Sequence, residues 1–361
     1  MKTLFSLLLL FVSFFINAEI TPQKDSVFFR VIDTGAGLAT LLVIQSDTDN
    51  DGIVESDENF FIVFDTGHWN TIEHVSNEII SLIPDDEKID LMFLSHPDSD
   101  HLAATSTILS KVKTDTIIRT GFQRPDTGTW AKMQDAIRLT TAKNGLRDVD
   151  LKYDKLKPGT VWRFGEATLE LLSGFSEPPK DWDLGFNPDD SEFISRQRNA
   201  ISLVVKLSYQ GKHILITGDA VGRKDGPPKD SRSIATEKYL LDNNLERPIN
   251  ADILIAPHHG SDNGSSKDFI KAVSPKWVVF SAGHSHGHPK KSVVNRYKSF
   301  LSPDPIILTT DFGDNDEGKD GWSTGDCKDA SGDDGITFLI RKQGNSASIS
   351  FEQDQSKPCI N

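Results

Sequence analysis

A seven-residue segment rich in histidine and aspartate, SHPDSDH at positions 95–101, constrains the fold of this chain more than any other. The apolar run 89–94 before it predicts a buried strand, and residues 102–112 after it predict a helix. Open α/β sheets bind their ligands at the carboxyl ends of strands, in loops of this kind. The segment therefore predicts an α/β fold with a ligand site at this loop.

Four ionisable side chains within six residues repel one another or stay hydrated unless they bind a cation. We predict that His96 and Asp98 bind one metal ion and that Asp100 and His101 bind a second. The alternative is a solvated turn in which Asp98 or Asp100 caps the following helix.

The distribution of the ten histidines favours the metal hypothesis. Seven of them fall in three predicted strand-to-helix loops: His96 and His101, His258 and His259, and His284, His286 and His288. Asp219 follows another apolar strand, 213–218, in a loop of the same kind. Histidines scattered through a core would not keep to one end of the strands. For the last group, an incidental metal-binding tract remains the alternative.

The remaining pattern predicts one large α/β domain without a linker or an internal repeat. Strands predicted at 27–33, 39–45 and 59–65 are spaced as antiparallel neighbours. A helix is predicted over 70–83 and another over 129–144, and a further strand begins at Asn199. A hairpin formed by 335–341 and 346–351 closes the domain.

The loop between the second and third predicted strands matches the calcium-loop pattern D-x-D-x-D-G-x5-E over residues 47–58. Asp47, Asp49, Asp51 and Glu58 would supply the carboxylates, and a glycine the sharp turn. We predict a structural calcium ion here. The alternative is a hydrated, acidic hairpin tip.

Two terminal features indicate export. Residues 1–18 have a basic start, an uncharged stretch from 4 to 16 and a small residue, Ala18, so they predict a signal peptide followed by a mature domain, 19–361. The alternative is a membrane anchor that stays attached. No later stretch is apolar enough to span a membrane, and we expect a periplasmic or secreted protein. Cys327 and Cys359 would form a disulfide in an oxidising compartment; two free thiols are the alternative.

The net charge of −14, or −15 without Lys2, excludes one class of partner. Tight binding to duplex DNA needs a basic surface, which this chain lacks. A small anionic group held on metal ions remains compatible with the charge.

The ordered segments SHPDSDH, NAISLVV, LITGD, PHHGS and SAGHSHGHP resemble the metallo-β-lactamase superfamily, and within it the hydrolase domain of ComEC-type competence (DNA-uptake) proteins. The resemblance spans about residues 27–351. It implies a four-layer αβ/βα sandwich with two divalent transition-metal ions at one edge of the sheets.

By matching position, the resemblance assigns His96 and Asp98 to the first ion and Asp100 and His101 to the second. Asp219 would bridge the ions, and His259 would join the second ion, with His258 as the less favoured choice. The superfamily usually has histidine at the positions of Asp98 and Asn199. The oxygen-rich first site favours Mn²⁺, and Zn²⁺ remains the alternative. The turn DTGAGL also departs from this branch, because Leu38 replaces an acidic residue.

The resemblance implies a phosphodiesterase or nuclease-like hydrolase that uses a metal-bridging hydroxide on a small or polymeric phosphoester, and the predicted signal peptide would make this enzyme an exported one. Asp100 would orient the nucleophile, and His288 would hydrogen-bond the phosphate or protonate the leaving group. Asn199, His284 and His286 would contact the substrate. The alternatives are a lactam or lactone hydrolase and a non-catalytic, calcium-stabilised binding protein.

Overall fold

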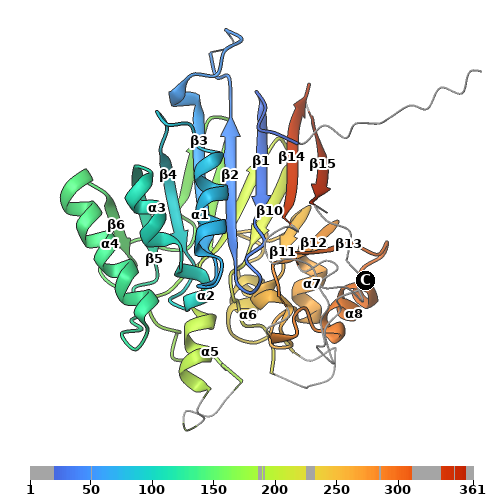
Figure 1. Ribbon diagram of the computed structural model, residues 1–361. Helices are drawn as coiled ribbons and strands as arrows, with labels where there is room; N and C mark the ends of the chain where they lie inside the picture. Colours follow the sequence, from blue (N-terminus) through green and yellow to red (C-terminus); the bar gives the residue numbers. More distant parts are fainter. Residues whose placement is uncertain are drawn as a thin grey trace, which may run out of the picture.

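Two mixed β-sheets form the interior of the molecule. The computed structural model describes residues 20–49, 51–185, 189, 192–224, 232–283, 286–310, 335–344 and 346–354. The first sheet contains, in spatial order, β15 (Ser346–Gln353), β14 (Ile336–Gln343), β1 (Ser26–Val31), β2 (Ala39–Gln45), β3 (Asn59–Thr66), β4 (Ile89–Leu94), β5 (Thr114–Arg119) and β6 (Arg147–Asp150) (Figure 1). The second contains β13 (Ile306–Thr309), β12 (Trp277–Phe280), β11 (Ile253–Ile255), β10 (Lys212–Ile216), β9 (Val204–Tyr209), β8 (Ala167–Ser173) and β7 (Val161–Phe164).

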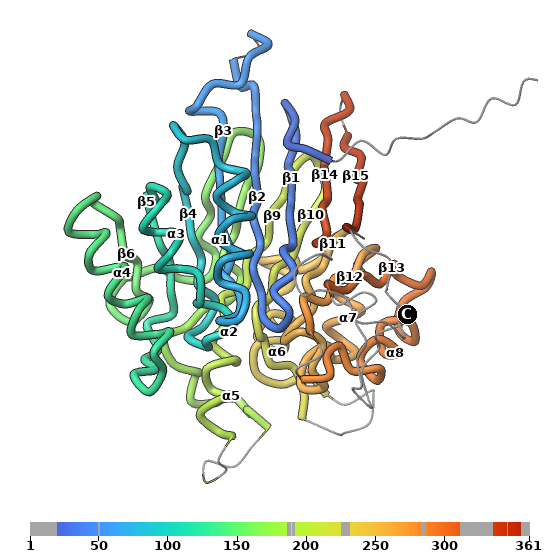
Figure 2. The backbone as a smooth tube through the Cα atoms, viewed as in Figure 1, coloured from blue at the N-terminus to red at the C-terminus, as the bar shows by residue number. Residues whose placement is uncertain are grey.

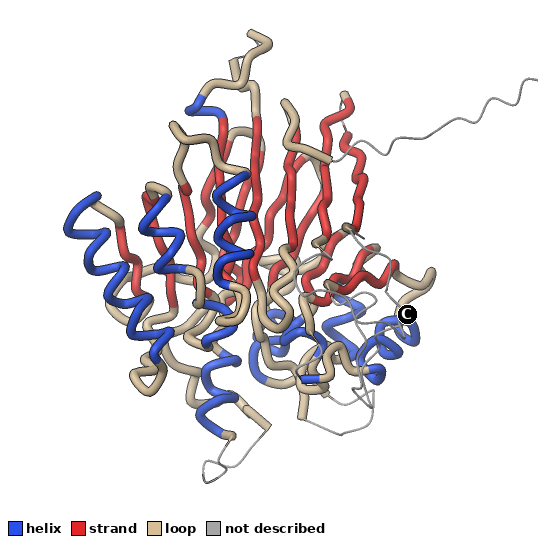
Figure 3. Tube along the Cα trace, viewed as in Figure 1, coloured by secondary structure: helices blue, strands red, loops and turns tan. Residues whose placement is uncertain are grey.

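Helices cover the outer faces of both sheets. They are α1 (Ile72–Ser81), α2 (Ser99–Leu102), α3 (Thr105–Lys111), α4 (Gly128–Asn144), α5 (Phe193–Ala200), α6 (Ala235–Asp242), α7 (Lys267–Val273) and α8 (Lys291–Phe300). Figure 3 shows α1, α3 and α4 along one face of the first sheet, while α6, α7 and α8 pack on the second. Short 3₁₀ turns occupy Ser56–Glu58 and Pro257–Gly260.

Alternation of side chains along the strands builds the layers. In β4, Leu91 and Phe93 face the core between the two sheets, whereas Met92 faces the helices of the first sheet. In β11, Ile253 and Ile255 enter the shared core and Leu254 the helical layer of the second sheet. One core common to both sheets confirms the predicted single-domain αβ/βα sandwich.

The strand pairings place the predicted loops at one edge. The three N-terminal strands pair antiparallel, as predicted. Strands β3 to β6 are parallel to one another, and so are β10 to β13. Figure 2 shows α2 and α5 at the lower edge, and the loop between β2 and β3 at the opposite, upper edge.

Two sequence predictions were wrong. The helix over 102–112 is split, because the backbone N–H groups of Ala103 and Ala104 donate to the carbonyls of Gly67 and Thr66 at the end of β3. Asn199 does not begin a strand. It lies in α5, and β9 starts only at Val204, after a connector whose Leu203 N–H donates to the carbonyl of Ser95.

Some predictions fall on residues that the structure does not describe. These are the signal peptide at 1–18, the Cys327–Cys359 disulfide and the position of His284. Among the described helices, none combines the length and the apolar character needed to cross a membrane.

Candidate metal centre

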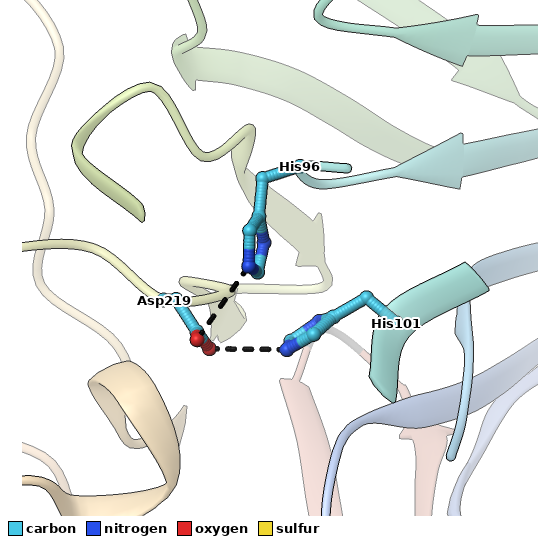
Figure 4. A group of neighbouring side chains, drawn as sticks. All are labelled: His96, His101 and Asp219. Carbon is cyan, nitrogen blue, oxygen red and sulfur yellow. Dashed lines mark ion pairs between the residues drawn. The ribbon is translucent and has the colours of Figure 1, made fainter. Parts of the chain in front are cut away.

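Asp219 lies between histidines that come from both sheets. His96 follows β4 and His101 lies in α2, whereas Asp219 follows β10. Asp219 Oδ1 is 3.2 Å from His101 Nε2, and Asp219 Oδ2 is 3.6 Å from His96 Nε2 (Figure 4). All three side chains are almost fully buried. This geometry lets one carboxylate serve two neighbouring cations.

A second cluster of donors overlaps the first. His259 Nε2 is 3.2 Å from both His101 Nε2 and Asp219 Oδ1. Asp100 Oδ2 lies 3.6 Å from His259 Nε2 and 3.8 Å from His101 Nε2. The candidate metal-binding groups are therefore His96, His101 and Asp219, and Asp100, His101 and His259.

Asp65, which sequence reasoning treated only as the end of a strand, orients both histidines of the first sheet. It is fully buried and accepts hydrogen bonds from His101 Nδ1 at 2.7 Å and Ser95 Oγ at 2.6 Å. Because the Ser95 hydroxyl proton is used in this way, its oxygen accepts from His96 Nδ1 at 3.0 Å. Both imidazoles then direct Nε2 toward Asp219, and this is the nitrogen that would bind an ion. Such outer hydrogen bonds fix the tautomer of metal-binding histidines.

Hydrogen bonds at Nδ1 also hold the histidines of the second sheet. His259 Nδ1 donates to the carbonyl of Ser281 at 2.7 Å, and His258 Nδ1 donates to Asn263 Oδ1 at 2.7 Å. Both residues adopt positive φ values, 54° for His259 and 49° for His258. This turn directs His258 Nε2 to within 3.5 Å of Asp219 Oδ2.

Unpaired polar atoms show that the cluster fits cations. His96 Nε2 and Asn199 Oδ1 are buried and have no hydrogen-bond partner. An imidazole lone pair and an amide oxygen without donors are costly to bury, and a divalent ion would satisfy both. Imidazole with carboxylate is a donor set that suits zinc.

The charges in the cluster also favour the binding of cations. Burial raises the pKa of Asp219, but the histidines around it outweigh burial and hold this pKa well below its ordinary value. Burial lowers the pKa of His101, but Asp219, Asp65 and Asp100 raise it well above the ordinary value. The pKa of His259 is raised for a similar reason. Cations and protons therefore compete for the same nitrogens.

Asp98 is placed differently from the other predicted ligands. Its Oδ1 accepts a hydrogen bond from Arg198 Nε at 2.5 Å and forms an ion pair with Arg124 at 2.8 Å. Its Oδ2 is 3.9 Å from His96 Nε2. The structure thus engages Asp98 with arginines, and its role as a metal ligand stays a prediction.

A pocket of about 550 Å³ opens onto this cluster. Asn199 and His286, which were predicted to contact the substrate, line it together with Asp100 and His288, which were predicted to act in catalysis. Sequence reasoning missed the other contributors, since no local pattern marks them: Trp69, Arg124 and Ser195. Burial and the neighbouring imidazoles lower the pKa of His288 to about 2. At neutral pH, His288 is therefore suited to donate a hydrogen bond rather than to carry a charge.

The glycine turn after β1 packs directly against the metal loop. Gly37 has a φ of 124°, and a Cβ there would lie 2.2 Å from the carbonyl oxygen of Asp100. The next N–H, of Leu38, donates to the same oxygen at 3.2 Å. The turn therefore positions Asp100 through its backbone, without an acidic side chain at Leu38.

The acidic loop at 47–58 lies at the opposite edge of the sheets. Its carboxylates form two overlapping groups, Asp47 with Asp49 and Glu58, and Asp49 with Asp51 and Glu55. Asp47 pairs with Lys24, and Thr48 donates to Glu58. Three of the four predicted ligands, Asp47, Asp49 and Glu58, form one group, whereas Asp51 groups with Asp49 and Glu55, and calcium binding stays a prediction.

Comparisons with known proteins give the same family as the motifs. The family model described as the metallo-beta-lactamase superfamily matches residues 49–284. The chain is 24% identical to ComE operon protein 3 of Bacillus subtilis over 211 residues, which is 58% of this chain and 22% of that protein. It is 33% identical to competence protein ComA of Neisseria gonorrhoeae over 103 residues, 28% of this chain and 13% of that protein.

The chain spans less than a quarter of the length of these curated relatives. Among solved structures, it is similar to Zn²⁺-bound PqqB from Methylobacterium extorquens. That match has 10% identity and a TM-score of 0.39, and it covers 78% of this chain and 97% of PqqB.

Proposed function

We propose that this chain, which belongs to the metallo-beta-lactamase superfamily, is an exported, metal-dependent phosphodiesterase. One observation carries the proposal: Asp219 lies between the Nε2 atoms of His96, His101 and His259 at the base of an open pocket. The similarity to competence proteins supports a phosphodiester substrate by analogy only.

The protein side chains have separable roles in this proposal. His96, His101, Asp219, Asp100 and His259 would hold two divalent ions. When bound, such ions lower the pKa of water and neutralise charge on phosphate oxygens. Asp100, at the pocket wall, would orient the attacking water.

Two residues on the pocket wall would act on the substrate itself. His288 would donate a hydrogen bond to a phosphate oxygen, because its low pKa keeps it neutral. Asn199 would contact the substrate or an ion through its unpaired Oδ1.

The choice of ion and the cellular site belong to the same proposal. Three imidazoles with two carboxylates favour Zn²⁺, and an Asp98 released from its arginines would favour Mn²⁺. A calcium ion at 47–58 would be structural, because that loop is at the other edge of the sheets. Export rests on the residue pattern of 1–18.

A substrate panel tests the proposal. Protein loaded with Zn²⁺ or with Mn²⁺ is assayed with bis(p-nitrophenyl) phosphate, p-nitrophenyl phosphate, single-stranded DNA and nitrocefin. We expect metal-dependent turnover of the diester and none of nitrocefin. Nitrocefin turnover without diester cleavage would overturn the proposal in favour of a lactam hydrolase.

A further inference from the structure

Two arginines from distant parts of the sequence meet on one carboxylate beside the metal centre. Arg124 lies in the loop after β5, and Arg198 lies in α5. Asp98 Oδ1 lies 2.8 Å from Arg124 and 2.5 Å from Arg198. The side chains of Asp98 and both arginines are 13–20% exposed, so all three are largely shielded from water.

One carboxylate cannot neutralise two guanidinium groups. Within the described residues, no other carboxylate lies within 4 Å of either arginine. Asp98 and the two arginines together therefore carry a net positive charge. Each guanidinium has five N–H donors, and Arg124 Nε is buried without a hydrogen-bond partner.

The two arginines differ in their relation to the substrate pocket, because Arg124 lines it and Arg198 lies beside residues that line it. Arg124 lines it directly, together with Asp98 and Asp219. Arg198 lies next to Asn199 in the sequence and within one turn of Ser195, and both of these residues line the same pocket. Planar guanidinium groups bind phosphate oxygens with two parallel hydrogen bonds, which an ammonium cannot reproduce.

We propose that Arg124 and Arg198 form a clamp for the non-bridging oxygens of an anionic phosphoester, with Asp98 as the positioning residue that holds both. The inference rests on the proposed function and narrows its substrate class, because a neutral ring substrate gains nothing from the clamp. The clamp also explains why position 98 has a carboxylate, because a histidine there would not anchor two arginines.

Binding of inorganic phosphate to the metal-loaded protein tests the clamp without any turnover. The variants are Arg124→Gln, Arg198→Gln and both together, with Arg138→Gln as the control. Arg138 is an exposed residue of α4 that pairs only with Asp135 among the described residues. Isothermal titration should show phosphate affinity reduced about tenfold or more in each single variant, a typical loss for a charged hydrogen bond. The control should be unchanged.

Kinetics and metal content separate the clamp from a structural role. For the diester, the clamp variants should raise KM much more than they lower kcat, and Arg124→Lys should rescue only partly. Metal content and melting temperature should stay as in the wild type. Asp98→Asn should keep both ions and weaken phosphate binding.

Each other result has a definite meaning. Unchanged phosphate affinity in the double variant overturns the clamp, and so does loss of an ion from Asp98→Asn with normal phosphate binding by the arginine variants. A wild type that binds phosphate through these arginines but cleaves no diester overturns the proposed function and leaves the clamp standing.

Discussion

Two acidic loops at opposite edges of the first sheet look alike in sequence and differ in structure. The loop 95–101 inserts His96 and His101 into a buried cluster that also receives side chains from the second sheet. In the loop 47–58, the candidate ligands come from a single segment, and several of them are exposed. The number of candidate ligands in a loop therefore does not show whether the loop contributes to a site built from both sheets or holds an ion by itself.

The difference lies in how each set of donors is held. In the metal centre, Asp65 and Ser95 hold the imidazole rings of His101 and His96 through their Nδ1 atoms. In the other loop, Lys24 pairs with Asp47, so a calcium ion would compete with a cation of the protein. A preorganised site favours tight binding, and a loop that must exchange partners favours weaker binding.

The largest expected effect comes from removing the carboxylate that joins the two sheets. Asp219→Asn should lose at least one ion and reduce diester turnover by more than the roughly 10- to 100-fold typical of losing an outer hydrogen bond. Elemental analysis and kinetics measure both. Asp135→Asn, on the exposed face of α4, is the control. Full metal occupancy in Asp219→Asn would remove this residue from the centre.

Preorganisation predicts the next effect. Asp65→Asn keeps the shape of the side chain but weakens its hold on His101 Nδ1 and on the Ser95 hydroxyl. Metal affinity, measured by competition with a chelator, should fall roughly 10- to 100-fold. An unchanged affinity would show that other contacts set the histidine tautomers.

The acidic loop should respond to calcium independently of the pocket. Calcium at a hundredfold excess over its Kd would stabilise the fold by about 2.7 kcal/mol. Asp49→Ala combined with Asp51→Ala should abolish the rise in melting temperature and leave diester turnover unchanged. If calcium shifts wild type and variant equally, the ion binds elsewhere and this loop is a hydrated turn.

Lowering the pH should release the ion bound at His101 before it releases calcium from the loop 47–58. Neighbouring carboxylates raise the pKa of His101 above the ordinary value in the metal-free site, so protons compete with an ion for His101 increasingly as pH falls below that raised value. Hydrogen bonds from Thr48 lower the pKa of Glu58, which therefore stays ionised to lower pH. Each proton taken up weakens metal binding by up to about 1.4 kcal/mol per pH unit. Metal content after desalting at each pH is compared with the calcium-induced melting shift; loss of the calcium response first would contradict the order.

Sequence reasoning succeeded where strand direction decides position. Asp219 and His259 follow the neighbouring parallel strands β10 and β11, so their proximity could be predicted, whereas the approach of His96 from the other sheet depends on how the sheets pack. It failed where a contact depends on tertiary packing. Nothing near Arg124 in the sequence indicates that it meets Arg198 at Asp98, and an isolated aspartate such as Asp65 carries no local signal for orienting a histidine.

The apolar run after Asn199 led to a wrong strand prediction for a related reason. Residues 201–203 are buried like a strand, yet their backbone is used to connect α5 to the metal loop. Burial explains why Ile201 and Leu203 are apolar, and only the three-dimensional path shows that this stretch does not pair as a strand.

The placement of Asp219 opposite His96 and His101 has a consequence for how the molecule comes apart. A cation with ligands from both sheets can stay bound only while the sheets are packed together. It therefore acts as a removable cross-link between the two halves of the sandwich. Chelation should then speed hydrogen exchange along the seam between the sheets, even at amides far from the ion. The same ions that equip the pocket for chemistry would decide how readily the sandwich opens.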